Sequence, residues 1–172
     1  MPASNTPALS LRVELAHIEP RIWREVTVPT NVTLEHLHDV LQIVMGWENR
    51  HLYEFRVGSR SYLSQHAVET LMQRGEDRPE STQLAELHLK SGDEFEYVYD
   101  FGDYWEHRIR VLAQIKPDDA TRHARCSGGQ GVCPPEDCGG LPAYMELQRL
   151  GKVPAHAECD IVGINRLLQK RR

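Results

Sequence analysis

The sequence predicts an α+β domain: an antiparallel or mixed sheet built from two or more β-hairpins, with packed helices and a Cys/Gly/Pro-rich loop. Paired segments in which apolar and polar residues alternate with a period of two are typical of half-buried hairpin strands. One strongly amphipathic segment between them repeats its apolar residues at helical spacing. At 172 residues the chain fits one domain. We therefore treat 1–172 as a single unit, with its core at about 9–168.

The first hairpin is expected at 11–15 and 22–28. In the first of these segments the apolar residues alternate with charged ones, and Pro20 ends it. The second is rich in residues that favour strands, and Pro29 closes it because proline cannot donate a hydrogen bond to a β-ladder.

A helix is expected over 33–45. Thr33 is a suitable N-cap, and Gly46 suits the left-handed residue that ends many helices. Because intermediate-burial histidines are mostly structural, we interpret His38 as a hydrogen-bonded core residue and not as a ligand. The apolar stripe of this helix consists of Leu34, Leu37, His38, Leu41, Val44 and Met45.

The middle of the chain is less regular. Two short strands are expected at 51–57 and 61–63, followed by a helix at 64–73. The charged, proline-broken segment 76–80 indicates a surface loop, and 82–89 is either weakly helical or extended.

The second hairpin has the strongest pattern in the chain. After Gly92, aromatic residues fall on one face of a strand, and a turn at 101–104 leads into a second alternating strand at 105–115. His107 shares a face with apolar residues, so we expect it to point into the core.

From Lys116 the composition changes to a loop rich in Gly, Pro and Cys. It contains Cys126, Cys133 and Cys138. A helix at 143–150 and a last helix at 161–169, which Asp160 can cap, follow this loop.

Several separated strings resemble the plasmid pRiA4b ORF-3-like family, and the match covers roughly residues 9–168 in the family's order. The resemblance implies a compact α+β fold and, in some members, an association with mobile DNA, but it supplies no catalytic residue. One departure is Glu158-Cys159-Asp160, where the family more often has an aromatic residue before the aspartate. The strings that carry the resemblance are Pro20-Arg21-Ile22-Trp23-Arg24, Thr33-Leu34 with Leu37-His38, Met45-Gly46-Trp47, His51-Leu52-Tyr53-Glu54-Phe55, Tyr97-Val98-Tyr99-Asp100-Phe101-Gly102-Asp103-Tyr104-Trp105-Glu106-His107 and Cys133-Pro134-Pro135-Glu136-Asp137-Cys138-Gly139-Gly140.

Charge and composition bear on partners and location. The formal net charge of −5 gives no cationic surface for general nucleic-acid binding, so a protein partner is favoured over a nucleic acid. No segment has the apolar length of a membrane span, and the N-terminus lacks a signal-peptide pattern, so we expect a cytoplasmic protein without membrane contact. In a reducing compartment, four cysteines point to metal binding, redox chemistry or burial.

The cysteine spacing predicts a zinc site. Cys126, Cys133 and Cys138 form a Cys-x6-Cys-x4-Cys arrangement in which thiolates can converge without long-range closure. Inward-facing His107 is the first candidate for the fourth ligand and Cys159 the second. The alternative is three reduced thiols in an irregular loop.

A second constellation competes for the same histidine. Asp100, Asp103 and His107 could bind a hard metal ion and activate water if Glu136 or Asp137 approached them. The simpler interpretation of Asp103 is turn chemistry, since Asp often bonds nearby backbone amides.

With no catalytic motif identified, the sequence favours a non-enzymatic binding or accessory domain, stabilised by zinc. The alternative is a metal-dependent hydrolase that uses Asp100, Asp103 and His107. The number of protein ligands would separate the two, because structural zinc is closed by four ligands whereas catalytic zinc keeps one position for water.

Overall fold

The structure is a computed structural model that describes residues 6–71, 78–154 and 157–170, and it confirms the α+β class. In these ranges seven strands form one sheet in the order β4-β3-β5-β6-β1-β2-β7. Its six pairs of neighbouring strands are all antiparallel. The sheet is therefore antiparallel and not mixed.

The elements follow the predicted order along the chain. The strands are β1 (Ala8–Leu15), β2 (Trp23–Pro29), β3 (Tyr53–Val57), β4 (Arg60–Leu63), β5 (Glu94–Tyr99), β6 (Trp105–Ile115) and β7 (Arg125–Gln130). The helices are α1 (Leu34–Met45), α2 (Gln65–Leu71), α3 (Gly140–Arg149) and α4 (Ile161–Lys170), with short 3-10 turns η1 (Leu84–Leu87) and η2 (Asp119–Arg122).

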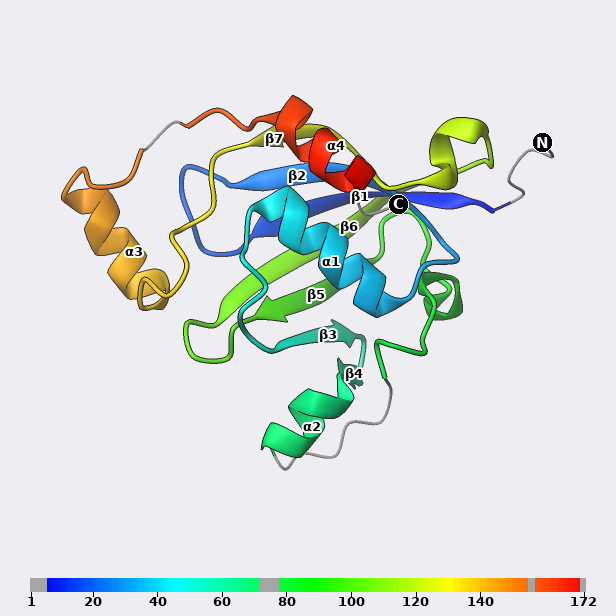
Figure 1. Ribbon diagram of the computed structural model, residues 1–172, viewed down its shortest axis with the longest axis horizontal. Coiled ribbons are helices and arrows are strands. Elements are labelled where there is room, and N and C mark those ends of the chain that lie inside the picture. Colours follow the sequence, from blue (N-terminus) through cyan, green and yellow to red (C-terminus); the bar gives the residue numbers. More distant parts are fainter. Residues whose placement is uncertain (1–5, 72–77, 155–156, 171–172) are drawn as a thin grey trace.

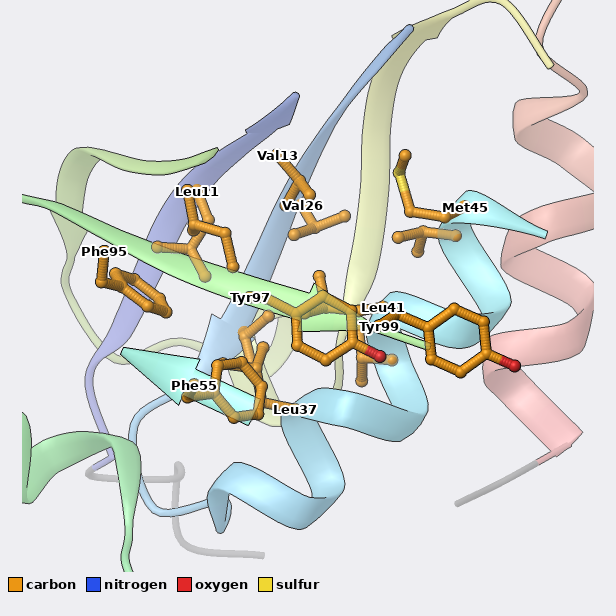
Figure 2. Packing of buried hydrophobic residues seen from close by; sticks show 14 of the residues in the cluster. Leu11, Val13, Val26, Leu37, Leu41, Met45, Phe55, Phe95, Tyr97 and Tyr99 are labelled. Atoms are coloured by element: carbon orange, nitrogen blue, oxygen red, sulfur yellow. The ribbon is translucent and has the colours of Figure 1, made fainter. Parts of the chain in front are cut away.

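Helix α1 lies across one face of the sheet (Figure 1). It begins as predicted, because the Thr33 hydroxyl accepts a hydrogen bond from the His36 N–H at 3.1 Å. It ends at Gly46, whose φ of 95° is left-handed. Figure 2 shows the core between this helix and the sheet; its labelled side chains are Leu11, Val13, Val26, Leu37, Leu41, Met45, Phe55, Phe95, Tyr97 and Tyr99.

Both predicted hairpins are confirmed. β1 pairs with β2, and β5 pairs with β6. A further antiparallel pairing of β1 with β6 joins the two hairpins into one sheet. Because side chains alternate along a strand, the residues at every second position of these strands, including Val13, Tyr97 and Ile109, lie on the face that α1 covers.

The other face of the sheet carries charged side chains in matched pairs. Arg12 is 3.2 Å from Glu25 across β1 and β2, and Arg110 is 3.9 Å from Glu94 across β6 and β5. The Arg12 guanidinium also lies 4.0 Å from the centroid of the Trp23 ring. This face therefore presents a mosaic of both signs and not a cationic stripe.

The region around Cys126 differs from the expectation. The predicted Cys/Gly/Pro-rich loop contains edge strand β7, which pairs with β2 and places Cys126 in the sheet. Glycine is a poor strand former, so the Gly128-Gly129 pair argued for a loop. Tertiary contacts override that preference here, since Cys159 and Arg24 occupy the space that a side chain at Gly129 would fill.

Two other predictions are affected by the limits of the described chain. The helix expected at 64–73 is confirmed as α2 up to Leu71, and 72–73 lie outside the described residues. The expected loop at 76–80 is only partly inside them. Within the described ranges, no helix combines the length and apolar character that crossing a membrane requires.

Candidate functional site

The four residues predicted to bind zinc have separate surroundings. Cys126 is buried in β7, whereas Cys133 and Cys138 are half-buried in the segment between β7 and α3. All are free thiols. No trio drawn from these cysteines and His107 has its ligand atoms within 4.8 Å of one another. Zinc binding by this set stays a prediction, and the geometry does not favour it.

His107 is fully buried, as predicted, but both of its ring nitrogens are engaged. Nε2 accepts a hydrogen bond from the Trp47 indole N–H at 3.1 Å, so the proton is on Nδ1, which donates to the Tyr97 carbonyl at 3.1 Å. Burial lowers the pKa of His107 to about 4. His107 thus serves as a neutral hydrogen-bonding residue of the core.

A different histidine meets the carboxylates. Within the described part of the chain, one trio of potential metal ligands converges: His51, Asp100 and Asp137, whose ligand atoms all lie within 4.8 Å of one another. His51 Nε2 is 2.6 Å from Asp137 Oδ1 and 3.6 Å from Asp100 Oδ2. Glu136 adds a third carboxylate, with Oε1 at 3.7 Å from the same nitrogen.

This arrangement corrects the predicted Asp100–Asp103–His107 constellation. Asp100 belongs to the cluster, and Asp137 approaches it as the prediction required, but His51 supplies the imidazole. Asp103 instead accepts a hydrogen bond from the Gly139 N–H at 3.0 Å. The turn role expected of Asp103 belongs to Asp100, whose Oδ1 accepts the Gly102 N–H at 2.9 Å.

The cluster carries a surplus of negative charge. Three carboxylates face His51, and the Arg50 guanidinium lies 3.7 Å from one of them, at Asp137 Oδ2. The Glu136 and Asp100 side chains are only 7% and 10% exposed, so water screens them poorly. A metal cation placed at this point would therefore be stabilised.

The loop that carries His51 is held by side chains from three other elements. The backbone N–H of Glu48 donates to Glu136 Oε2 at 3.0 Å, and that of Arg50 donates to the Tyr99 hydroxyl at 2.9 Å. The Asn49 N–H donates to Gln42 Oε1 of α1 at 2.7 Å. Each of these three amides thus has a fixed partner, which orients the next residue, His51.

Tyr99 joins this loop to the Cys-Pro-Pro-Glu-Asp-Cys-Gly-Gly segment. Its hydroxyl donates to Glu136 Oε1 at 2.6 Å. Burial, followed by the hydrogen bond to Glu136, raises the pKa of Tyr99 well above its usual range, so the hydroxyl stays a donor. The neighbouring inward residue of β5, Tyr97, bonds His38 and Gln42 at 2.7 and 2.8 Å and so fixes α1 against the same strand.

Sequence reasoning missed His51 because no local pattern marks it. It was predicted to begin a strand at 51–57, but that strand begins at Tyr53 and His51 lies in the loop before it. Its partners are 49 and 86 residues away, in loops that meet only in the folded chain. A usable signal was present: His51, Asp100 and Asp137 each lie in one of the strings that resemble the same family. Left-handed backbone at Asn49, Asp100 and Asp137 marks the same three loops.

The fold and site define a class of protein: an α+β domain whose antiparallel sheet supports loops that gather one histidine and several carboxylates. Within that class, this chain belongs to the plasmid pRiA4b ORF-3-like family, whose model matches residues 7–164.

Two similar proteins place the chain among relatives of unassigned function. It is 38% identical over 146 residues to the uncharacterized protein y4hQ of Sinorhizobium fredii (strain NBRC 101917 / NGR234), a match that covers 85% of this chain and 74% of the relative. The crystal structure of MM3350, a protein of unknown function from Methanosarcina mazei Go1, superposes with a TM-score of 0.73 at 27% identity. That match covers 87% of this chain and 83% of the solved one.

Proposed function

We propose that this protein is a binding domain that holds one divalent metal ion at His51, Asp100 and Asp137, with zinc as the first candidate. The observation that carries the proposal is the convergence of an imidazole nitrogen and two carboxylates within 4.8 Å. Imidazole and carboxylate are both established zinc ligands, and the three acidic groups around one nitrogen supply charge to match a dication.

The local packing supports a preformed site. His51 is oriented through the amides of Glu48 and Arg50, and Asp100 is oriented by the Gly102 N–H. A metal ion would take the place of the hydrogen bond between His51 Nε2 and Asp137 Oδ1, which lie 2.6 Å apart.

Calorimetric titration of metal-free protein with zinc at neutral pH tests the proposal. His51→Gln removes the nitrogen ligand and should abolish binding at this site. His36→Gln is the matched control, because His36 is exposed on α1 and lies outside the cluster. Equal zinc binding at this site by wild type and His51→Gln would refute the proposal.

A metal-dependent hydrolase is the second candidate, with His51 in the place expected for His107. Three protein ligands would leave a coordination position for water, which the metal ion would acidify. The Glu136 carboxylate, fixed by Tyr99 3.7 Å from His51 Nε2, is placed to take the proton from that water. Glu136→Gln should then abolish hydrolysis while zinc binding remains.

The partner, the compartment and the genetic context of the protein are also proposals. A protein partner is favoured over nucleic acid by the net charge of −5 and by the paired charges on the open sheet face. Four free thiols fit a reducing, cytoplasmic compartment. The family description names a plasmid, which supports a link to mobile genetic elements, and the genes that flank this one test it.

A further inference from the structure

His38 is a buried histidine of α1 that is not itself part of the proposed metal site. It is 3% exposed, and both of its ring nitrogens have a partner. Nδ1 is 2.7 Å from the Tyr97 hydroxyl of β5, and Nε2 is 2.8 Å from Asn49 Oδ1 in the loop that carries His51. The imidazole stacks on Tyr53 of β3 with the ring centroids 3.6 Å apart, which fixes the plane in which both nitrogens point.

The direction of each hydrogen bond in this group follows from one fixed donor. The Asn49 backbone N–H can only donate, and it does so to Gln42 Oε1 at 2.7 Å. The other end of the same amide, Gln42 Nε2, is therefore the donor to the Tyr97 hydroxyl oxygen, at 2.8 Å. Because that oxygen already accepts from Gln42, the Tyr97 O–H is left to donate to His38 Nδ1. His38 Nε2 then carries the imidazole proton and donates to Asn49 Oδ1.

The four residues thus form a closed hydrogen-bond cycle that runs in one direction. It leads from the Asn49 backbone N–H through Gln42, Tyr97 and His38 and returns to the Asn49 side chain. If His38 carried its proton on Nδ1 instead, both His38 and Gln42 would donate to the Tyr97 oxygen, and the Tyr97 O–H would lose its acceptor. Tyr97 is 0% exposed, and a buried donor without an acceptor is strongly disfavoured. The cycle therefore specifies the neutral Nε2–H tautomer of His38.

The cycle joins the core of the protein to one point of the loop. His38 and Gln42 come from successive turns of α1, and Tyr97 comes from β5. The amide that follows in the loop, that of Arg50, is held by Tyr99 of the same strand. Breaking the cycle leaves this Tyr99 contact in place, so the loop should lose precision in its position while the domain stays folded.

We propose that His38, as the neutral Nε2–H tautomer, is a positioning residue for His51 and acts on it through Asn49. The cycle begins and ends on Asn49, so the loop is held at a backbone N–H and at a side chain together. The left-handed backbone of Asn49, with φ 53°, sets the course of the chain two residues before His51. The effect on metal affinity rests on the proposed function, because it requires that His51 is a ligand.

Nitrogen NMR of the imidazole in isotopically labelled, metal-free protein tests the cycle directly. Wild-type His38 should have its proton on Nε2 and none on Nδ1. Gln42→Glu keeps the acceptor for the Asn49 N–H but offers no N–H to Tyr97, so the Tyr97 O–H turns to the new carboxylate and His38 should be protonated on both nitrogens. A wild-type proton on Nδ1, or an unchanged His38 in folded Gln42→Glu, would overturn the proposal. The wild-type spectrum decides the point even if the glutamate variant does not fold.

Zinc titration tests the positioning role. Tyr97→Phe removes the hydroxyl that joins Gln42 to His38 and should weaken zinc binding about 10- to 100-fold, as is typical of residues that orient a metal ligand. Tyr53→Phe is the matched control, because Tyr53 stacks on the same imidazole but its hydroxyl takes no part in the cycle. Zinc affinity should be unchanged in this control. Circular dichroism shows whether both variants are folded, and equal zinc affinity of wild type and folded Tyr97→Phe would overturn the positioning role.

The two proposals fail in different ways. Wild-type protein that binds no zinc at His51 refutes the metal site, and hydrogen exchange of the Asn49 amide then replaces the titration. Tyr97→Phe should speed this exchange about tenfold, the equivalent of roughly one hydrogen bond, whereas Tyr53→Phe should not. Equal exchange rates in wild type and Tyr97→Phe would show that the cycle does not hold the loop.

Discussion

The Tyr99 hydroxyl donates a hydrogen bond to Glu136 at 2.6 Å, and this contact joins central strand β5 to the loop between β7 and α3. The same hydroxyl accepts the Arg50 N–H, so one side chain ties together two of the loops that form the cluster. The position of His51 therefore depends on a residue that is not itself a candidate ligand.

Tyr99→Phe should lower the free energy of unfolding by about 1–3 kcal/mol, because it leaves the Glu136 carboxylate and the Arg50 N–H without this partner. Urea denaturation measures the change. Tyr62→Phe is the matched control, since Tyr62 is equally buried in β4 and its hydroxyl makes no hydrogen bond that the described chain shows. Equal stability of Tyr99→Phe and wild type would mean that the contact contributes nothing.

His107 should make stability fall as the solution is acidified. The pKa of His107 in the folded chain, about 4, lies below the ordinary value of 6.5. Between pH 6.5 and pH 4 the unfolded chain therefore binds a proton at His107 that the folded chain does not bind. The stability that neutral His107 contributes to the fold is fully present above pH 6.5 and is lost as pH falls to about 4. The total loss is on the order of 3 kcal/mol in the free energy of unfolding. His107→Gln removes this titration while every carboxylate remains. Its unfolding free energy should depend less steeply on pH over that interval, and identical slopes would contradict the assignment.

Gly129→Ala should destabilise the fold by about 1–3 kcal/mol, because the new methyl group would lie under 3 Å from Cys159 Sγ and Arg24 Cδ. Arg24 cannot move away without losing hydrogen bonds to four carbonyls. Gly128→Ala is the adjacent control: its Cβ would meet Trp23 at an ordinary 3.5 Å. The midpoints of thermal unfolding of the two variants are compared. A midpoint for Gly129→Ala no lower than that for Gly128→Ala would show that the fold does not require a residue without a side chain at position 129.

Duplex DNA should bind weakly and without sequence preference. The net charge is −5, and Arg12 and Arg110 on the open sheet face are paired with glutamates across the strands. Fluorescence anisotropy with a labelled duplex at physiological salt gives the affinity. Submicromolar binding that persists at higher salt would reverse this conclusion and point to a role in handling mobile DNA.

The sequence predicted the hairpins and α1 because their signals are local. The alternation of apolar and polar residues in β1, β5 and β6 shows which side of each strand is buried. The apolar stripe of α1 shows the same for the helix. Together these buried faces define how the sheet and the helix pack. The same reasoning placed His107 in the core correctly.

The site could not be predicted in this way. His51, Asp100 and Asp137 lie in three loops whose conformations depend on long-range hydrogen bonds from Tyr99, Gln42 and Glu136. Spacing along the chain instead pointed to Cys126, Cys133 and Cys138, because spacing carries no information on which distant loops meet. Strand β7 was missed because pairing with β2 and the close approach of Arg24 outweigh the low strand preference of glycine.

The central claim is that a metal ion binds between His51, Asp100 and Asp137. Crystals grown with zinc and measured at the zinc absorption edge test it most directly, because the anomalous map locates the ion itself. We predict a peak about 2.0–2.2 Å from His51 Nε2 and from one carboxylate oxygen each of Asp100 and Asp137. A map without a peak at His51, whatever density it shows at the cysteines, would contradict the account.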